Sequence, residues 1–343
     1  MKRKLLNSLQ VAATFIGTIV GAGFASGREI IQFFTQYHGL GTIGAIMSGI
    51  FMTWVGTKMM IYARRIHAYS FNELLTALFG RQVGNVIQAL LFFIILSITG
   101  VMLAGSGAVF AEQIGWSREL GIFVTVFFAG LFLVRGVRGL LLVNVIVVPL
   151  LIGLIFFAFW TNGTGAQIFP ESRHIRWFLA SFNYAAFNLS TALVVLVPMA
   201  MAFKDEQVIR WGGIIGGLGL TLILVLSHLM LSGKSGIELY ELPMAEMVRP
   251  FGTLLHFTFV TVIFGEILTT FVGNIFGMTR QLCSIFPALF SLRTAMCLLL
   301  VCTMIIGQFS YSSLIATLYP LNGVLCAFVF VYMCMVRLPE KHR

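Results

Sequence analysis

The sequence predicts an all-α polytopic membrane protein with about ten transmembrane helices. Of its 343 residues, 59% are hydrophobic and only 10% are charged, and the mean hydropathy is +0.97. A soluble domain carries about 25% charged residues. Apolar segments of about 20 residues, the length that crosses a bilayer, recur along the chain with short connections between them. We therefore expect one transmembrane domain over residues 1–343.

Ten segments have the length and composition of a membrane span, and the first, sixth and eighth are long and interrupted. They are 8–36, 39–62, 83–111, 119–135, 139–160, 176–203, 209–232, 251–279, 293–308 and 312–336. Between the second and third, SFNELLTALFG (70–80) alternates apolar and polar residues at helical spacing, which predicts a short interfacial helix.

The basic residues predict the orientation, because cytoplasmic loops of membrane proteins are enriched in Lys and Arg. With the N-terminus inside, all but six of the 22 Lys and Arg residues fall on the inner side. The loop 233–250 on the outer side is acid-rich. We expect the protein to lie in the cell (plasma or inner) membrane with both termini in the cytoplasm. The same rule explains the net charge of +10, so no nucleic-acid partner is expected. The six outer basic residues are Arg28, Arg118, Arg173, Arg176, Lys234 and Arg249.

The two halves of the chain share a spacing. Gly41 and Gly44 open the second segment, and Gly213 and Gly216 lie 172 residues later in the seventh. The same offset carries the third, fourth and fifth segments onto later ones. A repeat of five spans places the second copy upside down, which is typical of secondary transporters. We expect repeat one over about 8–160 and repeat two over about 176–336.

Two segments carry helix-weakening residues near their middle. GAGFASGRE (21–29) has three glycines within seven residues, and FNYAAFNLST (182–191) crowds five polar residues into one span. Unwound backbone at membrane depth lines a cavity or is buried, so two such spans predict a solute site. Close helix packing through glycines four residues apart is the alternative. The candidate solute-binding residues are Gly21, Ala22, Gly23, Phe24, Ala25, Ser26, Gly27, Tyr184, Phe187, Asn188, Ser190 and Thr191.

The stretch GTIVGAGFASGREI (17–30) resembles the first helix of the amino acid–polyamine–organocation superfamily. More narrowly, the chain resembles the bacterial YkvI-type membrane proteins in span count and spacing. The resemblance implies a LeuT-type fold, a 5+5 inverted repeat in which helices 1 and 6 are broken around a central substrate. It also implies transport by alternating access.

In sodium-coupled members of that fold, one sodium ion lies between helix 1 carbonyls and helix 8 hydroxyls. The resemblance therefore implies a hypothetical sodium site at the carbonyls of Gly17 and Val20 and the hydroxyls of Thr269 and Thr270. Hard oxygen ligands suit such a cation. Alternatively, each threonine bonds to its own helix backbone.

Three of the charged residues within the expected membrane segments are candidate functional residues. Glu266 near the middle of the eighth segment is a candidate ion-binding residue, as a sodium ligand, a proton carrier or a structural partner of Arg28 or another base. Arg28 and Glu29 are candidate gate residues, and as neighbours on a helix they should face different partners. Arg28 can instead form a structural ion pair. Glu29 can simply cap the restarted helix or compensate its dipole.

The function expected from these features is ion-coupled secondary transport, with sodium or proton as coupling ion and no other cofactor. A small polar solute, an amino acid or related amine, is expected because the helix start after Gly27 attracts a carboxylate. A passive channel and a non-transporting solute sensor remain alternatives. An enzyme is not expected, since no nucleophile–base or metal constellation is visible. The expected partners are the solute and the lipid bilayer, with the protein as monomer or homodimer.

Overall fold

The computed structural model describes residues 2–135, 138–163, 175–203 and 205–340, and every regular element in them is helical. Each of the ten predicted segments coincides with a helix or a group of helices. Arg173, Lys204, Lys341 and Arg343, which enter the charge count, lie outside the described residues. The longer helices after the first segment are α4 (Gly39–Ile66), α5 (Phe71–Ala108), α6 (Arg118–Arg135), α7 (Arg138–Asn162), α8 (Arg176–Met201), α9 (Glu206–Leu231), α11 (Thr253–Ile285), α12 (Leu292–Ile306) and α13 (Tyr311–Met335).

Six of the described helical segments are long and apolar enough to cross a membrane. They comprise α4, α5 with the following π-helical turn η2 (Val109–Ile114), α8, α9, α11 and α13. Shorter apolar stretches lie in α7 and α12. The chain is therefore an all-helical membrane protein.

The helices begin where the sequence supplies caps. Ser70 accepts a hydrogen bond from the backbone N–H of Glu73 at the start of α5, and Asp205 accepts one from Gln207 at the start of α9. Ser291 and Thr294 form a reciprocal capping box at the start of α12. Each cap satisfies backbone donors that have no partner inside the helix.

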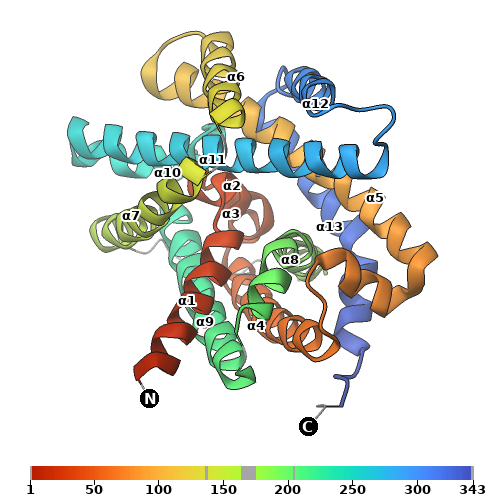
Figure 1. Cartoon of the computed structure of the whole chain (residues 1–343). Coiled ribbons are helices and arrows are strands. Elements are labelled where there is room, and N and C mark those ends of the chain that lie inside the picture. Colours follow the sequence, from red (N-terminus) through yellow and green to blue (C-terminus); the bar gives the residue numbers. More distant parts are fainter. Residues whose placement is uncertain (1, 136–137, 164–174, 204, 341–343) are drawn as a thin grey trace.

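The first segment is broken, as predicted. α1 (Lys2–Ile19) ends before Gly21, whose extended backbone precedes the short helix α2 (Ala22–Ser26). Gly27 then adopts a φ of +84°, and α3 (Arg28–Phe33) follows. Only glycine takes this left-handed conformation without strain, so Gly27 fixes the second interruption. Figure 1 shows α2 and α3 in the middle of the molecule.

The sixth segment is not broken, and the prediction that helix 6 unwinds around 182–191 is wrong. α8 is continuous from Arg176 to Met201. Its polar side chains bond to their own helix instead: Asn188 donates to the Tyr184 carbonyl at 3.1 Å, and Thr191 donates to the Asn188 carbonyl at 2.9 Å. Such bonds satisfy polar groups without opening the helix.

The predicted interfacial helix 70–80 is the first part of α5, separated from the rest by a kink. Gly80 there has φ 78° and ψ 166°. Gly252, 172 residues later, has φ 105° and ψ 157°, and it separates the short helices α10 (Pro243–Val248) and η4 (Arg249–Phe251) from α11. α7 and α13 begin at 138 and 311, which are 173 residues apart. The spacing seen in the sequence thus extends to backbone conformation.

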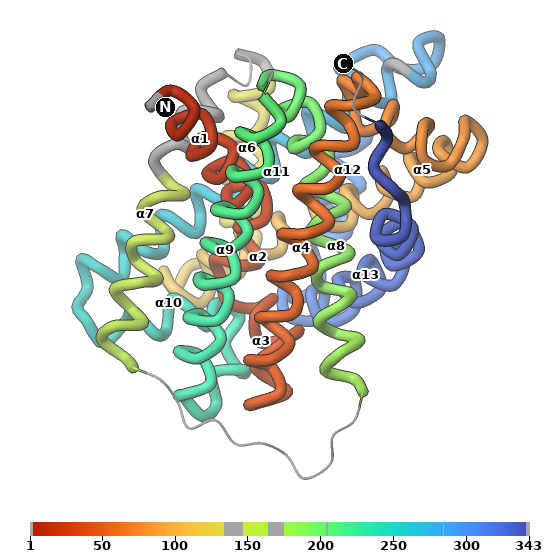
Figure 2. The backbone as a smooth tube through the Cα atoms, turned by 90° about the horizontal axis from the view of Figure 1, so that it is seen from below, coloured from red at the N-terminus to blue at the C-terminus, as the bar shows by residue number. Residues whose placement is uncertain are grey.

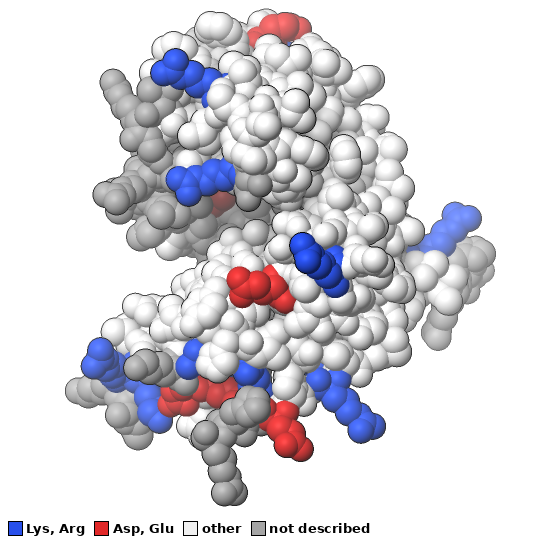
Figure 3. Space-filling model, turned by 45° about the vertical axis from the view of Figure 1, so that its right-hand side comes forward, with Lys and Arg blue, Asp and Glu red and all other residues white. Residues whose placement is uncertain are grey.

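The helices α1, α4, α8 and α9 pack together, and both chain ends lie at the same end of this group (Figure 2). The expected even number of membrane spans likewise requires both chain ends to lie on one side of the membrane. Glycines let α4 and α9 approach closely: a Cβ at Gly213 would be 2.2 Å from Thr57 Oγ1, and one at Gly217 would be 1.9 Å from Thr53 Oγ1. On the face shown in Figure 3, charged residues gather most densely at the lower edge and most of the surface is uncharged.

Candidate functional site

The centre of the candidate site is Glu29, which turns into the protein. It lies in the first turn of α3 and is only 5% exposed. Its carboxylate reaches back across the break to α2, where a Cβ at Gly23 would be 1.9 Å from Oε1. The other carboxylate oxygen, Oε2, is buried without a hydrogen-bond partner. Glu29 makes no side-chain cap on α3, since Gly27 is the N-cap and carries no side chain, so the simple capping role is wrong.

Aromatic side chains surround this carboxylate. Tyr319 on α13 interacts with Glu29, and the Tyr319 ring packs on Phe187 of α8 with centroids 4.8 Å apart. Tyr184 of α8 packs against Phe34, with centroids 4.9 Å apart. The hydroxyl of Tyr184 is buried without a hydrogen-bond partner. The site therefore holds two buried polar groups with unused hydrogen-bonding capacity, which is rare in folded proteins.

A second tyrosine of α13 ties the helix to the break. Tyr311 donates a hydrogen bond to Ser26 Oγ at 2.9 Å, and Ser26 donates to the Gly23 carbonyl at 2.9 Å. Sequence reasoning missed both Tyr311 and Tyr319. Their spacing of eight residues, a little over two helical turns, places them on one side of a largely apolar helix, and this signal was available.

The remaining predicted solute-binding residues differ in burial. On the broken helix, Ala22, Gly23, Phe24, Ala25, Ser26 and Gly27 are buried and Gly21 is partly exposed. On α8, Tyr184, Phe187, Asn188 and Ser190 are buried, whereas Thr191 is partly exposed. The structure brings α3 together with α8 and α13, and the solute-binding role of these residues stays a prediction.

The segment between α9 and α11 (residues 232–252), called the covering segment below, covers one side of the break. Arg28 points away from Glu29 and donates hydrogen bonds to the carbonyls of Glu238 and Tyr240, the latter at 3.0 Å. A Cβ at Gly27 would be 2.7 Å from Met244 Cγ in α10. Arg28 thus holds the segment that closes over α2 and α3 from this side, while the two adjacent charges meet different partners as predicted.

Acidic residues anchor the same covering segment at two more points. Glu112 accepts hydrogen bonds from the backbone N–H groups of Glu241 and Leu242, at 2.9 and 2.8 Å. Glu241 in turn accepts from the Ser312 backbone at 2.6 Å, at the start of α13. The covering segment is therefore hydrogen-bonded to α3, to η2 and to the start of α13.

The residues predicted to bind the coupling ion lie on α1, at Val20 directly after it, and on α11. Glu266 is 3% exposed and its Oε1 has no hydrogen-bond partner. Thr269 is buried and donates to the Glu266 carbonyl at 3.2 Å, so its hydroxyl bonds to its own helix in this structure. Thr270 is partly exposed. Val20 is buried, and a Cβ at Gly17 would contact Val148 of α7 at 3.7 Å.

No group of three or more His, Cys, Asp and Glu side chains within the described ranges could hold a metal ion. The sodium site expected from the resemblance uses carbonyl and hydroxyl oxygens instead, and it stays a prediction.

Comparison with known proteins identifies the family. No family model matches the chain. The chain is 38% identical over 346 residues to the uncharacterised membrane protein YkvI of Bacillus subtilis, and the match covers 97% of each chain. This chain belongs to the YkvI family of membrane proteins. The uncharacterised protein YyaD of the same organism is 25% identical and covers 95% of this chain and 96% of its own length.

Solved structures share the fold of this YkvI-family chain. The inward-facing conformation of Mhp1 matches with a TM-score of 0.62 at 12% identity, over 93% of this chain and 73% of Mhp1. A point mutant of the manganese transporter of Eremococcus coleocola matches with a TM-score of 0.63 at 14% identity, over 97% of this chain and 79% of the transporter. These neighbours have the LeuT-type fold, so the likeness to that fold is confirmed, whereas the 5+5 count of ten helices stays a prediction and the sixth segment is continuous in this chain. YkvI is a membrane protein and the Eremococcus coleocola protein is a manganese transporter, and neither description is that of an enzyme, in agreement with the prediction.

Proposed function

We propose that this protein is an ion-coupled secondary transporter of a small polar solute, an amino acid or related amine, that works by alternating access. The observation that carries the proposal is the double break of the first segment at Gly21 and Gly27 beside the buried carboxylate of Glu29. A buried carboxylate oxygen without a partner costs free energy, and in membrane helices such residues mark solute or ion sites.

The chemistry of the site suits a solute with a positively charged amino group. Glu29 Oε2 supplies an unpaired acceptor, and Tyr184, Tyr319 and Phe187 supply aromatic faces, which attract cations. The N-terminus of α3 lies one residue away and favours a carboxylate. Together these groups suit the two ends of a zwitterion such as an amino acid.

Alternating access is supported by the architecture that surrounds the site. The loop held by Arg28 covers the break on one side. The paired glycines Gly80 and Gly252 support a repeat of five spans in each half, and a 5+5 arrangement would place ten helices in the bilayer. In inverted repeats, rocking of one repeat against the other opens the two sides in turn.

The coupling ion is assigned to α1 and α11 in this proposal. Glu266 has one carboxylate oxygen without a partner and lies one turn before Thr269 and Thr270 on α11. A sodium ion would use these oxygens with the carbonyls of Gly17 and Val20, and a proton would use Glu266 itself. Both ions fit the proposal, and uptake under a sodium gradient or a pH gradient distinguishes them.

The test is solute uptake by the purified protein in proteoliposomes, with amino acids and amines supplied under a sodium gradient, a pH gradient or no gradient. We expect uptake above the equilibrium level under one gradient, and its loss in Glu29→Gln. Thr269→Ala should abolish a sodium effect. Thr261→Ala is the matched control, because Thr261 lies on the exposed face of α11 and its hydroxyl bonds to the Phe257 carbonyl of its own helix.

Three outcomes would overturn parts of the proposal. Uptake that only equilibrates the solute under every gradient would indicate a channel. Binding without flux would indicate a sensor. Unchanged coupling in both Glu266→Gln and Thr269→Ala would refute the assignment of the ion to α11.

A further inference from the structure

A groove separate from the candidate site runs along the outside of α4 and α9. It has a volume of about 850 Å³ and is closed on one side by the C-terminal residues that follow α13. The α4 and α9 residues Ile50, Trp54 and Leu218, which line it, are 59%, 50% and 62% exposed. In a membrane protein such apolar side chains face lipid rather than water.

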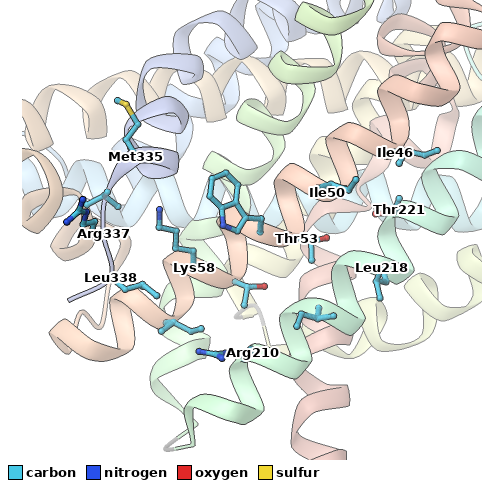
Figure 4. Close-up of a pocket in the computed structure, with 15 residues that line it drawn as sticks. Ile46, Ile50, Thr53, Lys58, Arg210, Leu218, Thr221, Met335, Arg337 and Leu338 are labelled. Atoms are coloured by element: carbon cyan, nitrogen blue, oxygen red, sulfur yellow. The ribbon is translucent and has the colours of Figure 1, made fainter. Parts of the chain in front are cut away.

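One end of the groove is basic. Lys58, Arg210 and Arg337 gather there, whereas Ile46, Ile50, Leu218 and Thr221 lie toward the other end (Figure 4). The Lys58 ammonium donates to the carbonyls of Met333 and Cys334 at 3.2 and 2.9 Å, and an ammonium has three donors. The side chain of Arg210 is 57% exposed.

The basic end keeps an excess of positive charge after its ion pairs are counted. Glu206 is the nearby acid, and it pairs closely with Arg65 at 2.6 Å. It also forms a looser ion pair with Arg210 at 3.8 Å, a distance beyond a hydrogen bond. Lys58, Arg210 and Arg337 therefore present three cationic groups to whatever occupies this end of the groove.

The dimensions match one leaflet of a bilayer. From Ile46 to Lys58 the helix α4 rises by about 18 Å at roughly 1.5 Å per residue. The hydrocarbon core of a bilayer is about 30 Å thick, so one leaflet contributes about 15 Å. The basic end lies at the start of α9 and the ends of α4 and α13, on the side of the molecule that holds both chain termini (Figure 2).

We infer that this groove binds one anionic phospholipid, with an acyl chain along Ile46, Ile50 and Leu218 and the headgroup phosphate among Lys58, Arg210 and Arg337. Basic groups between membrane helices attract anionic headgroups, and an apolar groove leading away from them holds the attached chain. Trp54 lies between the two parts, with the Lys58 ammonium 5.3 Å from its ring. An aromatic ring at that level suits the boundary between headgroup and hydrocarbon. The inference is independent of the proposed transport function.

The test measures thermal unfolding of the detergent-purified protein with added phosphatidylglycerol or phosphatidylcholine of identical acyl chains. The variant Arg210→Gln/Arg337→Gln removes two cationic groups and leaves the Lys58 bonds to α13 intact. The matched control is Arg81→Gln/Arg293→Gln, which removes two exposed basic residues away from the groove. Ile50→Trp is a second variant, which fills the apolar part without changing charge.

We expect phosphatidylglycerol to raise the apparent Tm of the unmodified protein and the control more than phosphatidylcholine does. That difference should fall by at least half in Arg210→Gln/Arg337→Gln, and Ile50→Trp should also weaken it. Equal responses to the two lipids in the unmodified protein would overturn the inference. So would an equal loss in the control, which indicates general charge attraction, or the same stabilisation by inorganic phosphate alone, which indicates an anion site without a lipid chain.

Discussion

The carboxylate of Glu29 lies directly on Gly23, across the break in the first membrane segment. A Cβ at position 23 would be 1.9 Å from Oε1, 2.7 Å from Cδ and 2.9 Å from Cγ of Glu29. The absence of a side chain at Gly23 therefore makes the room into which the carboxylate folds. A glycine that weakens the helix also positions the acid beyond the break.

This contact predicts a coupling between the two positions. Gly23→Ala should displace the Glu29 carboxylate and destabilise the protein by about 1–3 kcal/mol, the range for overpacking a filled interior. In a Glu29→Ala background the same substitution should cost much less. A double-mutant cycle on unfolding in detergent measures the coupling. Additive effects would show that the two residues do not contact each other.

The two tyrosines near Glu29 should respond differently to loss of their hydroxyls. Tyr319→Phe removes the hydroxyl that interacts with the Glu29 carboxyl, so we expect a loss of about 1–3 kcal/mol. Tyr184→Phe removes a buried hydroxyl that has no partner, so stability should change little or rise. Apparent Tm values of the two variants compare them directly. A larger loss in Tyr184→Phe would contradict this difference between the two hydroxyls.

Alanine substitutions at Gly27 and Gly21 test which break requires a left-handed backbone. Gly27→Ala places a Cβ at a φ of +84° and 2.7 Å from Met244, so we expect a loss of about 1–2 kcal/mol from backbone strain and more from the clash. Gly21→Ala meets no atom within 4 Å and has a negative φ, and it serves as the control. Unfolding in detergent reports both. Equal stability of the two variants would argue against a left-handed Gly27.

Arg28 should control the mobility of the loop that covers the break. In Arg28→Ala the carbonyls of Glu238 and Tyr240 lose their donor, so the amides of 237–240 should exchange hydrogen faster. Arg118→Ala is the control, since Arg118 donates to the carbonyl of Gly307 at 3.2 Å and its loss should speed exchange near 307–310. Hydrogen–deuterium exchange with peptide-level detection separates the two regions. Unchanged exchange at 237–240 in Arg28→Ala would rule out the anchoring role.

The helices and the first break could be predicted because apolar length, glycine content and caps are local properties. The break in the sixth segment could not, because asparagine and threonine either open a helix or bond back to it, and the choice depends on their neighbours. Asn188 and Thr191 bond back. The inward turn of Glu29 and its contact with Tyr319 also escaped prediction, since they depend on packing between α3 and α13, which lie almost 300 residues apart in the chain.

Gly80 and Gly252 carry a broader consequence. Each stands between a short helix and a long one, each has a positive φ with an extended ψ, and 172 residues separate them. In the proposed inverted repeat, these two joints would face opposite compartments. One mechanical element would then exist in two copies, so that opening toward one compartment and opening toward the other are the same movement, performed by each half of the chain in turn.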